Sequence, residues 1–413
     1  QLLGNGPVGG KLYHVSHDIK TALKKTLLPD SSMFESMGFS YMGPVDGHDV
    51  EALTQSLQWA REQRCPVLLH VRTVKGKGYS PAEERPADYH GVSPFDPVTG
   101  KPLRTAKMDF SHVFGQELTA LAGEDGRVCA ITAAMQEGTG LTEFARKYPD
   151  RLFDVGIAEG HAVSMAGGMA KQGLVPVFAV YSSFLQRGYD QLLQDVALDG
   201  LHVVLGVDRA GLVGADGETH HGCFDALYLS QVPHMTVLCP ASFAELRQML
   251  RRAVLELTGP VAVRYPRGGE GAYQDCCGNE TFTQVRPGAD CTILTYGVLI
   301  NEALAAAELL HEAGVETRVV KLNAIAPLDG NAVLAALGSE KRLLVLEDCV
   351  GSGCVGQRLT AILAQRGRMP ERLILKNLGD TIPCHGTVPQ LYAQCGLDAA
   401  SVAAALKEAC HEQ

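Results

Sequence analysis

Short apolar runs alternate with helix-length amphipathic segments along most of this 413-residue chain. The alternation is regular from about residue 108 to residue 270, and it resumes from about residue 288 to residue 410. Strands separated by helices pair in parallel, because each helix returns the chain to the end of the sheet at which the previous strand began. We therefore predict an α/β protein whose parallel sheets are covered by helices on both faces.

Each of the two regions has its own set of predicted elements. In the first, the predicted strands span residues 128–132, 152–157, 175–180, 203–207, 236–238 and 261–264, and we expect the second of these to be buried. The helical patterns between them span residues 113–122, 162–171, 185–197, 225–230 and 243–257. In the second region, the predicted strands span residues 292–295, 317–321, 343–346 and 373–376. This pattern predicts a larger α/β domain followed by a smaller one.

The first hundred residues follow a different pattern. A helical pattern at residues 50–63 precedes a predicted strand at residues 67–73. Residues 80–102 contain five of the twenty prolines and no clear periodicity, which predicts an extended linker or a loop over another surface. We therefore expect four parts: residues 1–79, a proline-rich linker at 80–107, and domains at 108–272 and 285–413.

Charge and cysteine content restrict the function classes. The formal net charge of −10 argues against a broad surface for nucleic acid or anionic membranes. No apolar run reaches the roughly 18 residues that a membrane span needs. The twelve cysteines include no Cys-x-x-Cys pair, so we predict reduced thiols in a cytoplasmic protein and no structural zinc site. Small molecules are the expected ligands.

Polar and glycine-rich segments follow four of the predicted strands in the first region. Glu159 lies between the strand at 152–157 and the next helix, and segments 181–187, 208–222 and 264–268 begin at or directly after the ends of later strands. In open parallel sheets, ligands bind at the carboxyl ends of the strands. We therefore expect these four segments to converge on one edge of the sheet and to form a ligand site there.

Each member of this set also has a simpler interpretation. Glu159 alone is adequately explained as a helix-capping acid. Arg209 and Arg267 suit either surface ion pairs or a fork that binds a phosphate. Asp216 and His220, in a glycine-rich loop, indicate either a flexible turn or hydrogen bonds to a polar substrate, with a metal site the weaker alternative. Phe184 suits a core position or a stacking platform for a flat ring.

These segments resemble the 1-deoxy-D-xylulose-5-phosphate synthases, which are thiamine-diphosphate enzymes of the transketolase superfamily. The resemblance extends from about residue 33 to the C-terminus. Its motifs are Gly43-Pro-Val-Asp-Gly-His-Asp49, Lys75-Gly-Lys-Gly-Tyr79, Asp154-Val-Gly-Ile-Ala-Glu-Gly-His161, Tyr181-Ser-Ser-Phe-Leu-Gln-Arg187, the segment from Asp208-Arg-Ala-Gly211 to His220, and Tyr265-Pro-Arg-Gly268. It implies that residues 1–79 are the tail of a diphosphate-binding domain, 108–272 a pyrimidine-binding domain and 285–413 a transketolase C-terminal-like domain.

The resemblance also implies roles for individual residues. Glu159 would hydrogen-bond the aminopyrimidine ring of thiamine diphosphate, Phe184 would pack on that ring, and Tyr79 and Arg187 would line the cofactor site. His90, Tyr181, Asp216 and His220 would surround the reacting carbon, although His90 taken alone suits a solvated loop. Arg209 and Arg267 would hold the phosphate of glyceraldehyde 3-phosphate. The implied reaction condenses that aldehyde with pyruvate and releases CO₂, in a homodimer that supplies isoprenoid, thiamine and pyridoxal precursors.

Two features depart from the family pattern. Gly160 replaces the usual Gln beside the key acid, and the chain contains no Gly-Asp-Gly motif of the kind that binds Mg²⁺ and the diphosphate. By resemblance, the first residues correspond to the region after that motif, so we expect Mg²⁺ ligands outside this chain and an inactive isolated chain. The alternatives are a split transketolase-like subunit that needs a partner chain, and a non-catalytic paralogue.

Overall fold

The computed structural model describes residues 33–92, 94–103, 107–276, 278, 280–338 and 341–411. The chain divides into two compact units, Gln1–Ala106 and Lys107–Gln413. In the described part of the chain, no helix is long and apolar enough to cross a membrane.

In the first unit, a helix crosses between two parallel strands. Strand β1 (Ser40–Asp46) pairs with β2 (Val67–Arg72), and α3 (Val50–Glu62) connects them. The short helix α2 (Met33–Ser36) precedes β1. A further helix, α4 (Ser80–Glu84), begins the segment expected to lack regular structure. The expectation is therefore wrong for residues 80–84. A helix can form there because Pro81 lies in its first turn, where the missing N–H group is tolerated.

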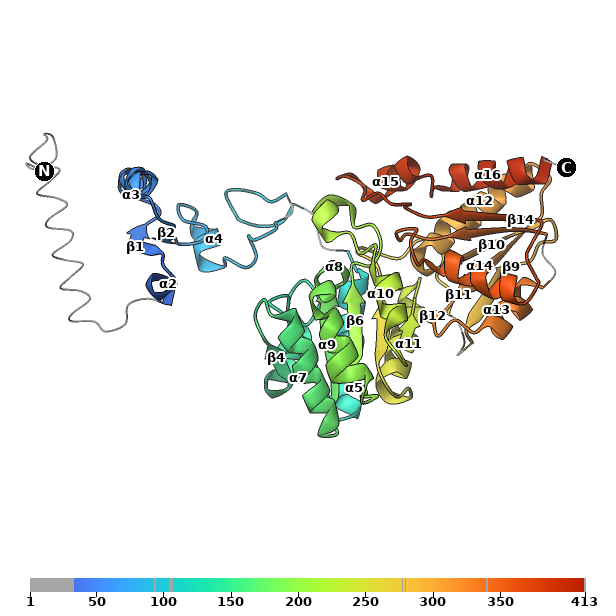
Figure 1. Ribbon diagram of the computed structural model, residues 1–413, viewed down its shortest axis with the longest axis horizontal. Helices are drawn as coiled ribbons and strands as arrows, with labels where there is room; N and C mark the ends of the chain where they lie inside the picture. Colours follow the sequence, from blue (N-terminus) through green and yellow to red (C-terminus); the bar gives the residue numbers. More distant parts are fainter. Residues whose placement is uncertain are drawn as a thin grey trace, which may run out of the picture. The chain divides into compact units, whose positions relative to one another are not determined.

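A seven-stranded sheet forms the first half of the second unit, which is coloured mostly from green to yellow in Figure 1. Its strand order is β12-β7-β8-β6-β5-β3-β4. All neighbouring strands pair in parallel except β12, which is antiparallel to β7. The strands are β3 (Val128–Thr132), β4 (Leu152–Asp154), β5 (Val175–Tyr181), β6 (Val204–Asp208), β7 (Thr236–Leu238), β8 (Val261–Arg264) and β12 (Ala324–Ala326).

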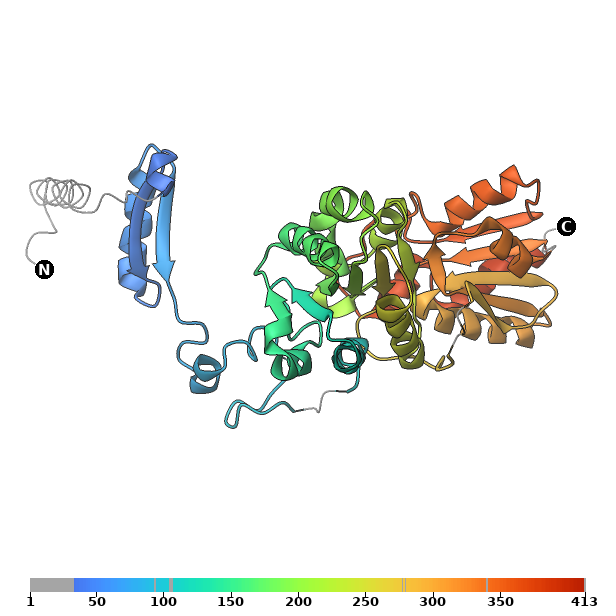
Figure 2. The ribbon, with the colours of Figure 1, turned by 90° about the horizontal axis from the view of Figure 1, so that it is seen from below.

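Helices cover both faces of this sheet (Figure 2). One face packs against α5 (Phe110–Glu124) and α11 (Phe243–Leu255), and the other packs against α7 (Glu159–Lys171), α10 (Asp225–Gln231) and residues 189–197. The central strands are fully buried, as a parallel sheet between two helical layers requires. The carboxyl ends of β4, β5, β6 and β8 therefore share one edge.

A five-stranded sheet with order β14-β13-β10-β11-β9 forms the second half of this unit. Its strands are β9 (Phe282–Arg286), β10 (Cys291–Tyr296), β11 (Thr317–Leu322), β13 (Arg342–Leu346) and β14 (Arg372–Lys376), with β9 antiparallel to β11. The helices α12 (Ile300–Glu312), α15 (Val388–Cys395) and α16 (Ala399–His411) pack on one face. On the other face, α13 (Gly330–Leu337) and α14 (Val355–Gln365) share a hydrophobic core with the seven-stranded sheet.

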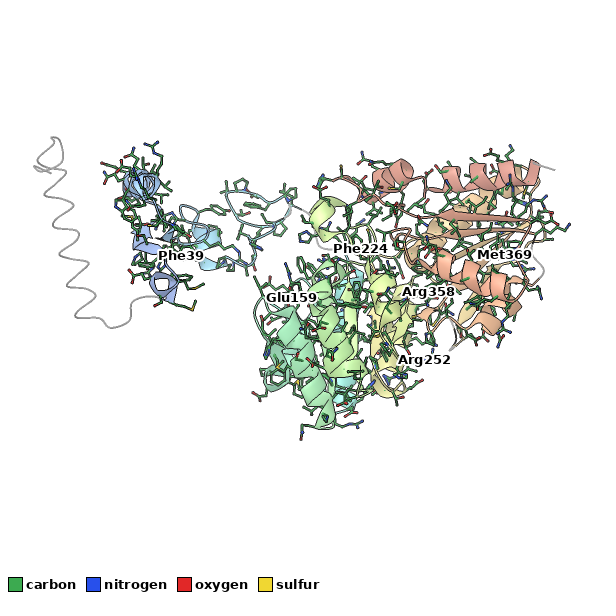
Figure 3. All side chains as sticks on the ribbon, in the orientation of Figure 1. Phe39, Glu159, Phe224, Arg252, Arg358 and Met369 are labelled. Carbon is green, nitrogen blue, oxygen red and sulfur yellow. The ribbon has the colours of Figure 1, made fainter. Side chains whose placement is uncertain are left out.

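Backbone pairing and polar side chains also join the two sheets. Strand β12 follows β11 of the five-stranded sheet in the chain, but it pairs with β7 of the seven-stranded sheet. The Lys321 ammonium and the Glu245 carboxylate, both fully buried, lie 2.9 Å apart. Arg358 on α14 donates a 2.8 Å hydrogen bond to Ser230 on α10 (Figure 3). The two sheets therefore form one packed body.

The predicted buried strand at residues 152–157 is wrong in length and burial. The strand ends at Asp154, and the side chains of Phe153 and Ile157 are 36% and 82% exposed. Among the described strands, β4 lies at the edge of its sheet and pairs only with β3, so an apolar run was not sufficient evidence of burial. The following helix begins at Glu159 itself.

The predicted elements differ from the structure elsewhere as well. The single helix expected at residues 185–197 is a succession of short pieces, α8 (Ser182–Leu185), α9 (Tyr189–Gln191) and a π-helical turn at Leu192–Ala197, with a 3₁₀ turn between α8 and α9. The strands β1, β9 and β12 were not predicted. Strands β9 and β12 are antiparallel edge strands, so each of the two larger sheets has one antiparallel strand at an edge and is otherwise parallel, as predicted.

Candidate active site

Four segments meet at the carboxyl edge of the seven-stranded sheet. They follow β4, β5, β6 and β8, which run in the same direction. The side-chain contacts described below link Glu159 and Arg267, the two ends of the set, through residues of the other two segments. The expected convergence of the polar side chains is thus seen in the structure.

Glu159 is a buried acid at the first turn of α7 (Figure 3). A carboxylate in the first turn of a helix is stabilised by the helix dipole. Its side chain is 3% exposed, and its Oε1 accepts a 2.9 Å hydrogen bond from Nη1 of Arg187. Among the described residues, the second carboxylate oxygen has no hydrogen-bond partner. One oxygen is thus fixed by Arg187, and the other is open to a ligand donor.

A row of rings lies beside this acid. The rings of Phe184 and Tyr181 are stacked with centroids 5.6 Å apart, and the ring of His220 meets Phe184 edge-on at 5.2 Å. The Arg187 guanidinium lies 5.4 Å from the Phe184 ring centroid. Phe184 is only partly buried, so it is not simply a core residue. Its neighbours hold the ring in place, as a stacking platform requires.

Arg209 is mostly buried behind Tyr181. Its guanidinium lies 3.9 Å from the Tyr181 ring centroid, and its Nη1 lies 2.8 Å from Oδ1 of Asp208. The same Nη1 donates to Oγ of Ser111 and to the carbonyl oxygen of Gly138. Its Nε is buried with no hydrogen-bond partner among the described residues. The backbone of Arg209 is in the left-handed region, with φ of 60°, a costly conformation that functional sites often contain.

Arg267 and Asp216 form a second, more accessible pair. Nε of Arg267 lies 3.2 Å from Oδ2 of Asp216, and Nη1 donates to the carbonyl oxygen of Val213. The side chains of Arg267 and Asp216 are 38% and 28% exposed. Burial raises the pKa of the nearby Tyr181 phenol, while Arg209 lowers it. Asp216 raises that pKa and Arg267 lowers it, each by less than Arg209 does.

The predicted site residues of the first unit have local partners of their own. The Tyr79 hydroxyl donates to the carbonyl oxygen of Pro97, and its ring packs against Tyr89 and Phe95. Nδ1 of His90 lies 2.7 Å from Nζ of Lys75. The structure brings eight predicted residues together in the second unit: Glu159, Tyr181, Phe184, Arg187, Arg209, Asp216, His220 and Arg267.

Sequence analysis missed several buried polar residues at this edge. Asp208 and Ser111 support Arg209, and the hydrogen bond between them is 2.7 Å long. Arg264 lies between the carboxylates of Asp225 and Asp348. Asp208 directly follows the strand predicted at residues 203–207 and Arg264 ends the one predicted at 261–264, which was a usable signal. Ser111, Asp225 and Asp348 have no such signal, because they reach the site only through folding.

Gly160, the residue that departs from the family pattern, lies beside Gln191. A methyl group on Gly160 would lie 3.2 Å from Oε1 of Gln191, so any larger side chain here would require Gln191 to move. Oε1 of Gln191 is buried and has no hydrogen-bond partner among the described residues.

Asp208 supports a prediction about pH. Burial raises its pKa from 3.8 to about 6, although Arg209 and Ser111 lower it. The unfolded chain therefore loses this proton at lower pH than the folded chain, and the wild type loses stability as pH rises from about 4 to about 6. The Asp208→Asn variant lacks this titration, so it should gain stability relative to the wild type over that range. Urea unfolding at several pH values measures this difference. If the wild type instead gained stability relative to Asp208→Asn as pH rises, the contact with Arg209 would lower the pKa of Asp208 more than burial raises it.

Three family models match successive parts of the chain. The 1-deoxy-D-xylulose-5-phosphate synthase model matches residues 2–73, the transketolase pyrimidine-binding domain matches 106–269, and the transketolase C-terminal domain matches 281–402. The 1-deoxy-D-xylulose-5-phosphate synthase of Pelotomaculum thermopropionicum is 42% identical over 418 residues, which cover 99% of this chain and 65% of that protein. The chain belongs to the 1-deoxy-D-xylulose-5-phosphate synthase family. It corresponds to the C-terminal part of the family's proteins.

Other relatives agree in extent and fold. The synthase of Desulforudis audaxviator is 44% identical over 384 residues, covering 92% of this chain and 60% of that protein. The chain thus spans 60% to 65% of the length of these two relatives. A split-gene transketolase, described as an inactive β4 tetramer, is 24% identical with a TM-score of 0.65, covering 74% of this chain and 99% of that one. A transketolase mutant from Pichia stipitis is 14% identical with a TM-score of 0.62, and the match covers 74% of this chain and 46% of that one. Both share the transketolase fold.

Proposed function

We propose that this chain provides the pyrimidine-binding side of a 1-deoxy-D-xylulose-5-phosphate synthase. The complete enzyme would condense pyruvate with glyceraldehyde 3-phosphate and release CO₂. The observation that carries the proposal is Glu159, buried at the start of α7 next to the half-buried ring of Phe184, in a chain that belongs to this family. The product would serve isoprenoid, thiamine and pyridoxal synthesis.

The residues present fit the pyrimidine ring of thiamine diphosphate. Glu159 has one carboxylate oxygen open to a ligand donor, and Phe184 has a ring that its neighbours hold in place. When bound, thiamine diphosphate supplies the electron sink for decarboxylation. Glu159 would hold a proton at a ring nitrogen, and Arg187 would fix the carboxylate in position. No group of three His, Cys, Asp or Glu side chains in the described ranges could hold a metal ion, so we assign Mg²⁺ to no residue here.

The remaining side chains would act on the substrates. Arg209 has a buried, unpartnered Nε, and Arg267 is partly exposed, so the two could together bind a phosphate. Asp216, His220 and Tyr181 would orient polar groups of the substrates near the reacting carbon. By the family resemblance, Tyr79 would have a cofactor-binding role and His90 a catalytic role.

The family assignment also supports proposals about the whole protein. We expect the boundaries 1–79, 80–107, 108–272 and 285–413 to separate a diphosphate-domain tail, a linker, a pyrimidine-binding domain and a C-terminal domain. We further propose a cytoplasmic homodimer. The isolated chain should not turn over, because the cofactor is held largely through Mg²⁺ and its diphosphate, and this chain lacks a Gly-Asp-Gly motif.

A fused enzyme tests the proposal. The part of the Pelotomaculum thermopropionicum synthase that precedes the matched segment is joined to this chain, and product formation is followed with two substrate pairs. We expect 1-deoxy-D-xylulose 5-phosphate from pyruvate and glyceraldehyde 3-phosphate. Preferential use of a ketose phosphate donor would instead support a split transketolase-like subunit. A fusion that binds thiamine diphosphate but turns over neither pair would support a non-catalytic paralogue.

Replacing Arg209 or Arg267 by Ala in the fused enzyme tests the phosphate assignment. A charge-assisted hydrogen bond contributes about 1.5–3 kcal/mol, so kcat/KM for glyceraldehyde 3-phosphate should fall about 10- to 100-fold. Arg→Lys should recover only part, because an ammonium group offers no planar fork. Unphosphorylated glyceraldehyde serves as the control and should be used about equally by all variants. Equal losses for both aldehydes would assign these arginines a structural role.

A further inference from the structure

Residues 211–222 form a closed loop that carries both Asp216 and His220. The backbone N–H of Gly211 donates to the carbonyl oxygen of Gly222, and the N–H of Gly222 donates back to Gly211. These two hydrogen bonds, 2.9 and 2.8 Å long, close the neck of the loop. Beyond this neck, Arg267 contacts Val213 and Asp216 within the loop, and the tip has further contacts with a segment from the other half of the unit.

Segment 384–388, which follows the last strand of the five-stranded sheet, packs against this tip. A methyl group on Gly214 would lie 3.1 Å from the carbonyl oxygen of Gly386 and 3.2 Å from the backbone N of Val388. A methyl group on Gly217 would lie 3.5 Å from the ring of His385. The backbone of the loop and this segment are thus in close contact at two points.

His221 is the hydrogen-bonded link between the two segments. Its side chain is buried, and its Nδ1 accepts a 3.2 Å hydrogen bond from the backbone N–H of Val213 within the loop. Because Nδ1 accepts, Nε2 carries the hydrogen of the neutral ring, and it donates to the carbonyl oxygen of Cys384 at 3.4 Å. One imidazole ring therefore connects both sides of the loop to the C-terminal segment.

The base of the loop has a second support from the same half of the molecule. The carboxylate of Asp348 lies so close to Gly211 that a methyl group there would overlap it. Asp348 is itself fixed by a 3.0 Å hydrogen bond from Nη2 of Arg264. The backbone N–H of Val350 donates to the carbonyl oxygen of Cys223, directly after the loop.

We infer that segment 384–388 holds the loop at 211–222 in its working conformation, and that His221 is the positioning residue of this contact. Together with Arg267, the C-terminal domain thereby positions Asp216 and His220. The catalytic consequence rests on the proposed function, whereas the structural link does not.

Amide hydrogen exchange of the full 413-residue chain, followed by mass spectrometry, tests the link directly, because local opening of a segment raises exchange in that segment alone. His221→Leu removes both hydrogen bonds and keeps an apolar side chain. His221→Gln keeps an acceptor and a donor. We expect exchange in peptides covering 211–222 and 384–388 to rise about 10-fold in the Leu variant, equivalent to about 1.4 kcal/mol. The Gln variant should remain near the wild type, and peptides from α7 and β10 should not change.

Gly214→Ala provides a second, independent variant, because the added methyl group would press on Gly386 and Val388. Gly200→Ala is its matched control, since Gly200 also has positive φ, 60°, but has nothing within 4 Å of the added methyl. We expect faster loop exchange in Gly214→Ala alone. Unchanged loop exchange in both His221→Leu and Gly214→Ala, acceleration throughout the chain, or a Gln variant as fast as the Leu variant would overturn the inference. None of these outcomes depends on whether the fused enzyme is active.

Discussion

Glu159→Gln in the fused enzyme should remove nearly all formation of 1-deoxy-D-xylulose 5-phosphate. The amide has nearly the same shape as the carboxyl group, but it cannot exchange a proton with a ring nitrogen. General acid–base catalysis contributes about 10²- to 10⁴-fold, so kcat should fall by that range. Glu159→Ala should fall at least as far, because it also leaves the Arg187 guanidinium without its carboxylate partner.

A matched control separates this effect from loss of a helix-terminal charge. Glu143 lies in the first turn of α6 (Thr142–Lys147) and is exposed. Glu143→Gln should retain wild-type kcat, and Glu159→Gln should retain the folded structure by circular dichroism. Near wild-type turnover in Glu159→Gln would mean that another residue performs the proton transfer.

Arg264→Met should strongly destabilise the 413-residue chain. Nε of Arg264 lies 2.9 Å from both carboxylate oxygens of Asp225, and Nη2 lies 3.0 Å from Asp348. All three side chains are buried, so removing the guanidinium leaves two carboxylates without their cation. Breaking a buried ion pair in this way costs about 3–5 kcal/mol. Urea unfolding measures the loss.

The pH dependence of this loss has a defined sign. Burial raises the pKa of Asp225, and Arg264 opposes that rise. Without Arg264, the pKa of Asp225 should rise further, so more of this buried carboxyl group is protonated and uncharged at pH 5 than at pH 8. The variant should therefore be less destabilised at pH 5 than at pH 8. Arg251→Met is the control, because Arg251 is exposed and pairs with exposed Glu124 and half-buried Glu117. Its removal should cost about 0–1 kcal/mol of stability. Equal losses for Arg264→Met and Arg251→Met would contradict this account.

Continuous apolar runs made the central strands predictable. The strand at residues 128–132 has the predicted bounds and is buried throughout, because a central parallel strand covered on both faces is almost wholly apolar. Strand β12 is different: Ala324–Ala326 carries little strand preference and forms by pairing with β7, more than 80 residues earlier in the chain. Such edge strands depend on tertiary structure, and local sequence does not reveal them.

The site was predictable to the extent that its residues follow strand ends. Glu159, Tyr181, Arg209 and Arg267 were located by that rule and by the family's motifs. Their contacts were not predictable, because Arg187, itself named from the family's motif, reaches Glu159 across 28 residues, and Arg264 reaches Asp348 across 84. Helix and strand periodicity carries no information about such distant pairs.

The fused enzyme provides the most direct test of the central claim that this chain carries the pyrimidine side of a 1-deoxy-D-xylulose-5-phosphate synthase site. The measurement is CO₂ release and 1-deoxy-D-xylulose 5-phosphate formation from pyruvate and glyceraldehyde 3-phosphate, for the wild-type fusion and its Glu159→Gln variant. We predict equal amounts of both products from the wild type and almost none from the variant. Equal rates in the two fusions, or a fusion that binds thiamine diphosphate and forms no product, would contradict the claim.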